Sequence, residues 1–182
     1  MLETLRNAWK IPDLRKRMTF TLLILLIYRI GSVAIPVPYL NPGVMSQMLA
    51  GDGNLLGFIN ILSGGAFEQA TLFALGISPY ITASIVIQLL TVAIPALERM
   101  AKEGEDGRKK INKINRYTTL GLALMQAVAY YFLLRNQGAL AYRDGFSGVF
   151  SAIVIIICFI TGGLVVMWLG ERIDEKGIGN GI

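Results

Sequence analysis

Four long apolar runs dominate this sequence and restrict it to a narrow class of folds. The chain has 182 residues, 54% of them hydrophobic, and charged segments separate the runs. A helix needs about 20 apolar residues to cross the hydrocarbon core of a bilayer. Because backbone groups in lipid must be hydrogen-bonded within the helix, the runs predict an all-α integral membrane protein, a bundle of helices. We expect the spans at residues 18–37, 77–97, 117–134 and 149–169.

A fifth, shorter apolar run lies ahead of the second span, at Leu55–Leu62. Ser63 and two adjacent glycines, Gly64 and Gly65, interrupt it, and each glycine costs a helix roughly 1 kcal/mol. The run is too short to span a membrane, so the pattern favours a re-entrant half-helix over about residues 55–67 that turns back into the second span. Such backbone survives at membrane depth only inside protein or beside a water-filled cavity. The same pattern also permits an ordinary external loop followed by one span.

Lys and Arg are distributed very unevenly between the segments that flank the spans. Segments 1–17, 98–116 and 170–182 carry 14 of the 17 basic residues, whereas 135–148 carries two and 38–76 none. Because basic residues gather on the cytoplasmic side, we expect a multi-pass protein with a cytoplasmic N-terminus, a cytoplasmic middle loop and a cytoplasmic tail. The half-helix then enters from outside. The net charge of +5 is a topology signal in this interpretation, and not a nucleic-acid surface.

The composition leaves little room for catalytic or metal chemistry. The chain has no His and a single cysteine, Cys158, so an intrachain disulfide, a zinc site and a Cys–His pair are not expected. The glycines of segment 177–182 follow a membrane span and lack the strand and spacing of a dinucleotide-binding loop. We interpret that segment as a hinge into a further helix. The sequence therefore predicts neither an enzyme nor a bound cofactor.

Several polar residues lie inside the apolar runs. Arg29 lies well within the first run, where a charge is costly. It would either extend toward the outer membrane surface or pair with a neighbouring helix, and unchanged folding of Arg29→Leu would argue against a required pair. Thr82, Ser84, Gln88 and Gln126 would form interhelical hydrogen bonds of about 0.6 kcal/mol each.

Residue spacing makes three further predictions. Ile77, Ile81 and Ile85 are four residues apart, so they share one helix face, which faces lipid or protein core on pattern alone. Gly104 and Gly107 indicate a turn within the charged middle loop. Small residues allow close helix packing in lipid. We expect packing seams at Ala123, Ala127, Gly162 and Gly163.

Six motifs together resemble one known family. They are NILSGGA at 60–66, FALGISPYITAS at 73–84, QLLT at 88–91, KEGEDGRKK at 102–110, WLGE at 168–171 and GIGNGI at 177–182. In this order they closely resemble the SecY family, whose members are the central subunits of a protein-conducting channel. The resemblance covers nearly the whole chain.

The resemblance implies a channel fold of two halves, each with five transmembrane helices. This chain corresponds to the N-terminal part of that fold, through the fourth transmembrane helix, and ends at Ile182 where the fifth would begin. It would lack the partner half of the channel. We therefore expect that the chain alone, as an N-terminal fragment, does not translocate proteins.

The resemblance also implies three sets of functional residues. The first is a ring of apolar side chains at mid-membrane, matched here by Ile77 and Ile81. The second is the plug, a short helix that seats against the ring, matched by Asn60, Ile61, Leu62, Ser63, Gly64, Gly65, Ala66 and Phe67. The third is a lateral gate toward lipid, matched by Thr82, Ser84, Gln88 and Gln126. Gly64→Asp should weaken closure and relax signal-sequence selection.

The function implied by the resemblance is a passive conduit in the plasma (inner) membrane for secretory preproteins and nascent chains. The implied partners are the subunits SecE and SecG, the motor ATPase SecA, the ribosome and membrane lipid, without sequence-specific nucleic-acid binding. The first alternative is a small-molecule secondary transporter with discontinuous helices, which would place charged or polar ligands at the break. The second is an intramembrane enzyme, disfavoured because no span carries paired acidic residues or a Gly-x-Ser-x-Gly sequence.

Overall fold

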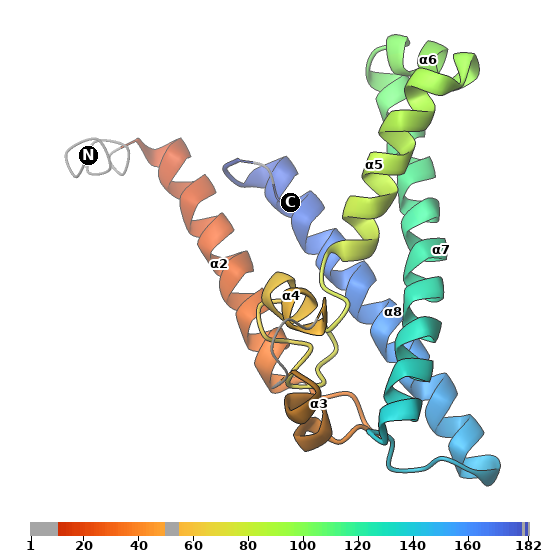
Figure 1. Ribbon diagram of the computed structural model, residues 1–182. Helices are drawn as coiled ribbons and strands as arrows, with labels where there is room; N and C mark the ends of the chain where they lie inside the picture. The colour runs from red at the N-terminus through yellow and green to blue at the C-terminus, as the bar shows by residue number, and fades with distance from the viewer. Residues whose placement is uncertain (1–10, 50–54, 180, 182) are drawn as a thin grey trace.

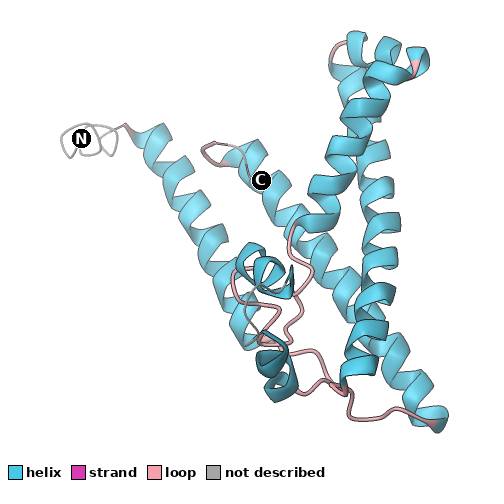
Figure 2. Cartoon of the chain, viewed as in Figure 1, coloured by secondary structure: helices cyan, strands magenta, loops and turns pink. Residues whose placement is uncertain are grey.

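The computed structural model describes residues 11–49, 55–179 and 181 (Figure 1). Its regular elements are helices joined by short loops (Figure 2). They are α2 (Pro12–Ala34), α3 (Pro42–Leu49), α4 (Leu55–Leu62), α5 (Ser78–Ala93), α6 (Pro95–Lys102), α7 (Glu105–Gln137) and α8 (Gly145–Lys176). Most of the predicted N-terminal segment, residues 1–10, lies outside the described residues.

Three helices, α2, α7 and α8, are each long and apolar enough to cross a membrane. They contain 23, 33 and 32 residues, which corresponds to about 35–50 Å at 1.5 Å per residue. The prediction of an all-α membrane protein is confirmed. Helices α7 and α8 extend beyond the predicted spans 117–134 and 149–169, because their polar ends continue the same helices past the apolar runs.

The charged middle segment differs from the predicted loop, because most of it is helical. Helix α6 ends at Lys102 and α7 begins at Glu105, so the turn is confined to Glu103 and Gly104. Gly104 has φ of +78°, which suits glycine. Gly107, predicted to lie in the turn, lies inside α7, where a Cβ would approach the carbonyl oxygen of Met100 to 1.7 Å. The face of α7 that carries Gly107 therefore packs directly against α6.

The second predicted span, 77–97, is not one straight helix. Helix α5 has 16 residues, about 24 Å in length and shorter than the roughly 30 Å of a bilayer core. It ends at Ala93, and α6 leaves at an angle of 101°. Pro95, the first residue of α6, has no N–H to continue the α5 ladder, and Ile94 before it is extended. Pro95 inside the apolar run was the signal for this bend.

The long helices differ in how extensively they contact one another (Figure 1). Helix α5 lies along α7, α7 packs against α8, and α2 reaches the others mainly through α8 and the segment that follows α4. The predicted seam residues Ala123 and Ala127 are fully buried. Gly162 on α8 is buried against Leu72, whose carbonyl oxygen would lie 1.8 Å from a Cβ at this position. The core therefore joins α7 and α8 to the segment between α4 and α5.

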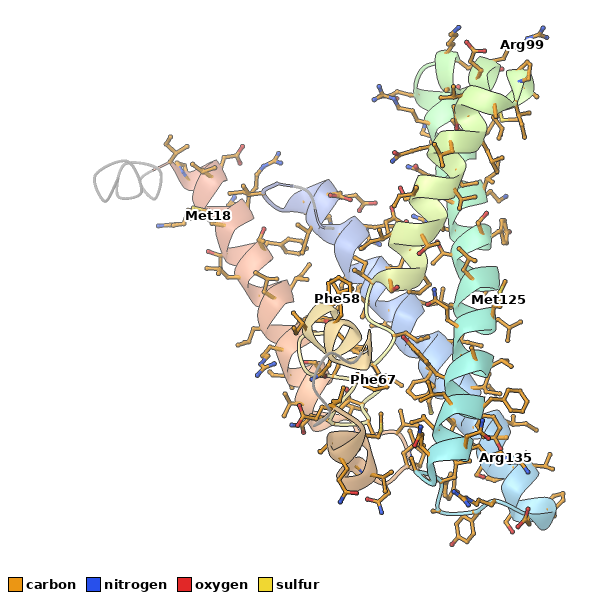
Figure 3. All side chains as sticks on the ribbon, viewed as in Figure 1. Met18, Phe58, Phe67, Arg99, Met125 and Arg135 are labelled. Carbon is orange, nitrogen blue, oxygen red and sulfur yellow. The ribbon has the colours of Figure 1, made fainter. Side chains whose placement is uncertain are left out.

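The surface of α2 is broadly apolar. Leu22, Leu26 and Ile30 are exposed along it, as a lipid-facing helix requires. The labelled side chains in Figure 3 place basic Arg99 at one end of the molecule and Arg135 at the other, with Met125 on α7 between them. Basic residues thus lie at both ends of the molecule, and exposed apolar side chains lie between them, as expected of a membrane-spanning bundle.

Candidate functional site

The first part of the site is the end of α4, where the chain reverses. Gly64 donates a hydrogen bond to the carbonyl of Ile61 (3.0 Å), and Gly65 donates to the carbonyl of Asn60 (2.9 Å). This pair of bonds is a Schellman turn, which satisfies the last carbonyls of a helix. Both glycines have positive φ, +64° and +86°, a conformation that costs glycine little. The two glycines therefore end α4 and reverse the chain, as the sequence indicated.

The segment that follows α4 is buried and bonded to the end of α2. Ala66 and Phe67 are completely buried. Val37 donates to the carbonyl of Ala70 (2.8 Å), and Leu72 donates to that of Ile35 (2.9 Å). The predicted plug residues 60–67 therefore divide into two parts, a helix end at 60–62 and a fixed base that includes Ala66 and Phe67. Figure 3 shows Phe58 on α4 and Phe67 on this base.

Asn60 and Glu68 form a reciprocal pair across the two glycines. The Asn60 side-chain amide donates to the Glu68 carboxylate (3.2 Å). The Glu68 backbone N–H donates to the Asn60 side-chain oxygen (3.0 Å). Ser63 adds a bond from its hydroxyl to the Asn60 carbonyl (3.0 Å) and accepts one from the Phe67 N–H (3.2 Å). The turn is thus closed by side chains as well as by backbone. Glu68 was not among the predicted site residues.

A small hollow brings the predicted ring residues to the end of α4. It has a volume of about 130 Å³ and is lined by Leu62, Ser63, Leu75, Gly76, Ile77, Ser78, Ile81 and Thr82. Ile77 lies just before α5 and Ile81 lies one turn into it, and both are half-buried. Ile85, on the same face, is exposed. The structure therefore brings two predicted sets together, the ring isoleucines and the last residues of the plug helix.

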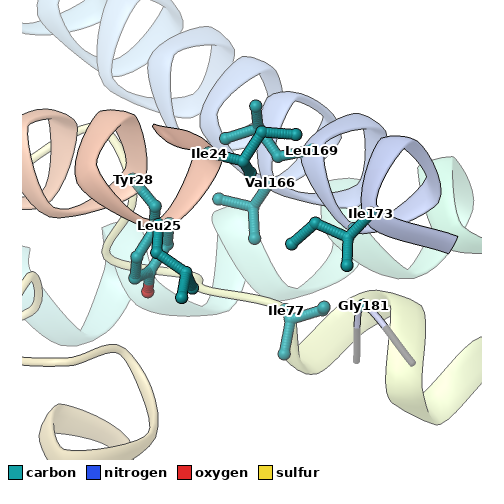
Figure 4. Close-up of a pocket in the computed structure, with 9 residues that line it drawn as sticks. Ile24, Leu25, Tyr28, Ile77, Val166, Leu169, Ile173 and Gly181 are labelled. Carbon is teal, nitrogen blue, oxygen red and sulfur yellow. The ribbon is translucent and has the colours of Figure 1, made fainter. Parts of the chain in front are cut away.

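Ile77 also faces a second, larger hollow between α2, α8 and the start of α5. It has a volume of about 230 Å³. Figure 4 shows Ile24, Val166 and Leu169 around it, with Ile77 at its edge. Tyr28 supplies the one side-chain hydroxyl, and no charged side chain lines it among the described residues. An apolar wall of this kind gives a passing solute no fixed hydrogen-bond partner and disfavours water and ions.

The predicted lateral-gate residues are not joined to one another across helices in the described part of the chain. Thr82 donates to the carbonyl of Ser78 (3.0 Å), and Gln88 donates to the hydroxyl of Ser84 (3.4 Å), all within α5. The Gln126 side-chain oxygen on α7 is buried without a hydrogen-bond partner among the described residues. Within the described part of the chain, the side chains of Thr82 and Gln88 bond inside α5, because hydroxyl and amide groups one turn apart can reach acceptors on their own helix. The predicted interhelical bonds of Thr82, Ser84 and Gln88 stay a prediction.

Arg29 contacts the end of α4. Its guanidinium donates to the carbonyl of Gly64 (2.8 Å), and the hydroxyl of the preceding Tyr28 donates to the carbonyl of Ser63 (3.0 Å). The sequence left two possibilities open for Arg29, extension toward the outer membrane surface or a pair with a neighbouring helix. The acceptor found here is a backbone carbonyl in the turn after α4. Tyr28 was missed altogether, because an aromatic residue in an apolar run carries no signal that it will bind a loop 35 positions later.

The described residues contain no cluster of three or more His, Cys, Asp or Glu side chains arranged to hold a metal ion. Charged groups gather instead in the first turns of α7 and the last turns of α8. There, Arg116 forms a two-bond ion pair with Glu171, both contacts at 2.8 Å. This pair joins two long helices.

Comparison with known proteins identifies the family. The sequence model of SecY matches residues 71–182. The chain belongs to the SecY family. Over its whole length it is 45% identical to the protein translocase subunit SecY of Streptomyces coelicolor, of which it spans 44%. It is also 45% identical to the SecY of Escherichia coli over 93% of the chain, spanning 38% of that protein. The chain therefore spans less than half the length of these curated relatives.

Two solved structures share the fold. One contains a SecY protein whose plug domain stabilises the closed state of the translocation channel and maintains a membrane seal, with a TM-score of 0.63 and 23% identity over 92% of this chain and 33% of the other. The second is Sec61 in the canine ribosome–channel complex from the endoplasmic reticulum, with a TM-score of 0.65 and 22% identity over 97% of this chain and 38% of the other. The predicted SecY channel fold is confirmed.

Proposed function

We propose that this chain forms part of the central pore-forming subunit of the Sec protein-conducting channel. In that role it passes unfolded secretory proteins across the plasma membrane and releases membrane segments sideways into lipid. The observation that carries the proposal is the meeting of Ile77 and Ile81 with the end of α4 around one apolar hollow. Membership of the SecY family supports it.

In this proposal Ile77 and Ile81 supply part of a constriction that closes by excluding water. Apolar constrictions gate by dewetting, so a narrow collar of isoleucines blocks ions when empty. The collar also conforms to passing chains of any sequence, because it offers no directional hydrogen bonds. The residues 60–67 then act as the plug, with α4 seated beside the two isoleucines and displaced when a chain enters.

The polar residues of α5 and α7 supply one side of the lateral gate in this proposal. Thr82 lines the same hollow as Ile77 and Ile81, and Gln126 has a buried side-chain oxygen without a partner among the described residues. Ser84 and Gln88 continue the polar track along α5.

The proposed conduit is passive and not an enzyme, with SecA or the translating ribosome as the energy source. The other proposed partners are SecE and SecG, together with the preprotein and surrounding lipid. The proposed orientation has a cytoplasmic N-terminus, because α6 and the start of α7 are rich in Lys and Arg. This basic end of the molecule, which includes Arg99 and Lys102, would contribute to the cytoplasmic docking surface.

Reconstitution tests this function against the transporter alternative. A full-length SecY subunit containing this sequence is placed in lipid vesicles with its partner subunits and SecA. We expect ATP-dependent uptake of a preprotein with a signal sequence, and no uptake when the signal is removed. Signal-independent accumulation of a small solute, without preprotein uptake, would contradict the proposal and support a secondary transporter.

A further inference from the structure

Helix α4 is attached to the rest of the molecule much more weakly than the segment that follows it. Ile61 is 77% exposed and Phe58 is 59% exposed, whereas Phe67 and Ala70 are completely buried. The boundary between the two regions lies at Gly64 and Gly65, where both residues have positive φ. Movement of the exposed helix about this glycine pair, with the buried base in place, therefore also requires the Asn60–Glu68 bonds across it to break.

Two side chains of α2 bind the chain at this boundary. The Tyr28 hydroxyl donates to the carbonyl of Ser63 at 3.0 Å, and Arg29 donates to the carbonyl of Gly64 at 2.8 Å. The C-terminal end of a helix carries partial negative charge on its free carbonyls. A guanidinium there forms a charge-assisted bond, which is stronger than a neutral one.

The Tyr28 donor is held in place on α2 by aromatic packing. The Tyr28 ring stacks on that of Phe73, with centroids 5.6 Å apart and planes inclined by 2°. Phe73 in turn lies directly over Gly31, where a Cβ would come within 2.2 Å of the ring. Because Gly31 has no side chain, the Phe73 ring can pack directly against α2. The Phe73 ring in turn holds the Tyr28 ring by stacking. The Tyr28 donor is therefore preorganised on the helix, next to Arg29.

We propose that Tyr28 and Arg29 form a latch that holds the end of α4 closed and sets how readily α4 is displaced. This inference rests on the proposed function of residues 60–67 as the plug. In the channel, Tyr28 and Arg29 are positioning residues, because they contact the plug and not the translocating chain. Their bonds oppose opening, so a signal sequence must bind strongly enough to break them. The latch thereby determines how strictly the channel selects among signal sequences.

The latch also accounts for the charge inside an apolar helix. Arginine at membrane depth costs several kcal/mol when it has no partner, so its presence in α2 requires a favourable contact. Loss of this charge-assisted bond should raise the ratio of open to closed channels by about tenfold, because the bond stabilises only the closed state. The neutral Tyr28 bond should contribute a smaller factor.

The test uses the full-length channel in vesicles, with two measurements on each variant. The variants are Arg29→Gln, Arg29→Lys and Tyr28→Phe, the last of which keeps the ring on Phe73. The measurements are ion leak without substrate and the export of two preproteins, one with an intact signal sequence and one with a defective signal sequence. Leu22→Gln is the matched control, because it places the same amide two turns earlier on an exposed face of α2.

We expect Arg29→Gln to raise ion leak and defective-signal export about tenfold while intact-signal export stays at the wild-type level. Arg29→Lys should restore most of the seal, Tyr28→Phe should give a smaller increase, and Leu22→Gln should give none. Normal leak and normal signal selection in both Arg29→Gln and Tyr28→Phe would overturn the latch, and so would equal loss of both kinds of export. If the unmodified channel itself exports no preprotein, the proposed function fails first.

Discussion

At the scale of single residues, close packing between segments of this protein depends on glycines, which have no side chain. Gly162 lets α8 press against the backbone at Leu72, and Gly31 receives the ring of Phe73. In lipid no hydrophobic effect drives helices together, so close van der Waals packing is the main source of helix association. These glycines therefore contribute more to the fold than an exposed ion pair, which is typically worth less than about 1 kcal/mol.

Gly162→Ala should destabilise the protein by roughly 1–3 kcal/mol, the usual cost of overpacking. The added Cβ would lie 1.8 Å from the Leu72 carbonyl oxygen, so backbone must shift. Gly121→Ala on α7 is the control, because no atom outside its own helix lies within 4 Å of the new Cβ. Thermal unfolding of the full-length subunit in detergent measures both variants. Equal melting temperatures for Gly162→Ala and Gly121→Ala would contradict this packing account.

The role of a residue could be predicted from the sequence where its type favours one particular backbone structure. Paired glycines after a short apolar run predict a reversal, and Gly64 and Gly65 make one. The roles of Tyr28 and Glu68 could not be predicted, because each depends on a partner that the fold supplies from elsewhere. For Arg29 the cost of a charge in an apolar run left two possibilities open, extension to the membrane surface or a pair with a neighbouring helix. The backbone acceptor at Gly64 is a property of the folded chain.

At the scale of elements, α4 and its turn form the unit whose motion matters most. Gly64→Val should loosen this unit, because a β-branched residue strongly disfavours the φ of +64° found there. Ion leak should rise and defective signal sequences should be accepted more often. Gly64→Asp should loosen the unit less than Gly64→Val does, since Asp tolerates positive φ better than a β-branched residue.

Gly57→Val, within α4 and without a close neighbour, controls for a bulky β-branched residue in the same element. It should leave the seal intact, because the residue keeps helical geometry. A leak in Gly57→Val equal to that in Gly64→Val would show that bulk alone, and not the turn conformation, disturbs closure.

Element boundaries were predicted less well than element type. The apolar runs identified α2, α7 and α8, because a span of lipid imposes a minimum length. Their polar extensions were missed, since charged residues continue a helix as readily as they form a loop. The bend after Ala93 follows from Pro95, but its angle of 101° depends on how α6 folds back on Gly107.

At the scale of the whole molecule, the helices and the segment between α4 and α5 line two mostly apolar hollows. Helix α2 stands apart from the α5–α7 pair, and the segment between α4 and α5 fills part of the space between them (Figure 1). Ile77 faces both hollows and therefore lies at the centre of the site. The motif order predicted the family and this fold, whereas pattern alone left the isoleucine face open to a lipid-facing interpretation.

Crosslinking from Ile81 is the most direct test of the proposed pore ring. The variant Ile81→Cys, with Cys158→Ser to remove the native thiol, is placed in the full-length channel with a secretory chain stalled in transit. We expect a crosslink that depends on the signal sequence, because the proposed ring places Ile81 on the path of the chain. Efficient crosslinks from Ser84→Cys or Gln88→Cys but none from Ile81→Cys would mean that another face of α5 lines the path. No crosslink from any of these positions, in a channel that exports normally, would contradict the account.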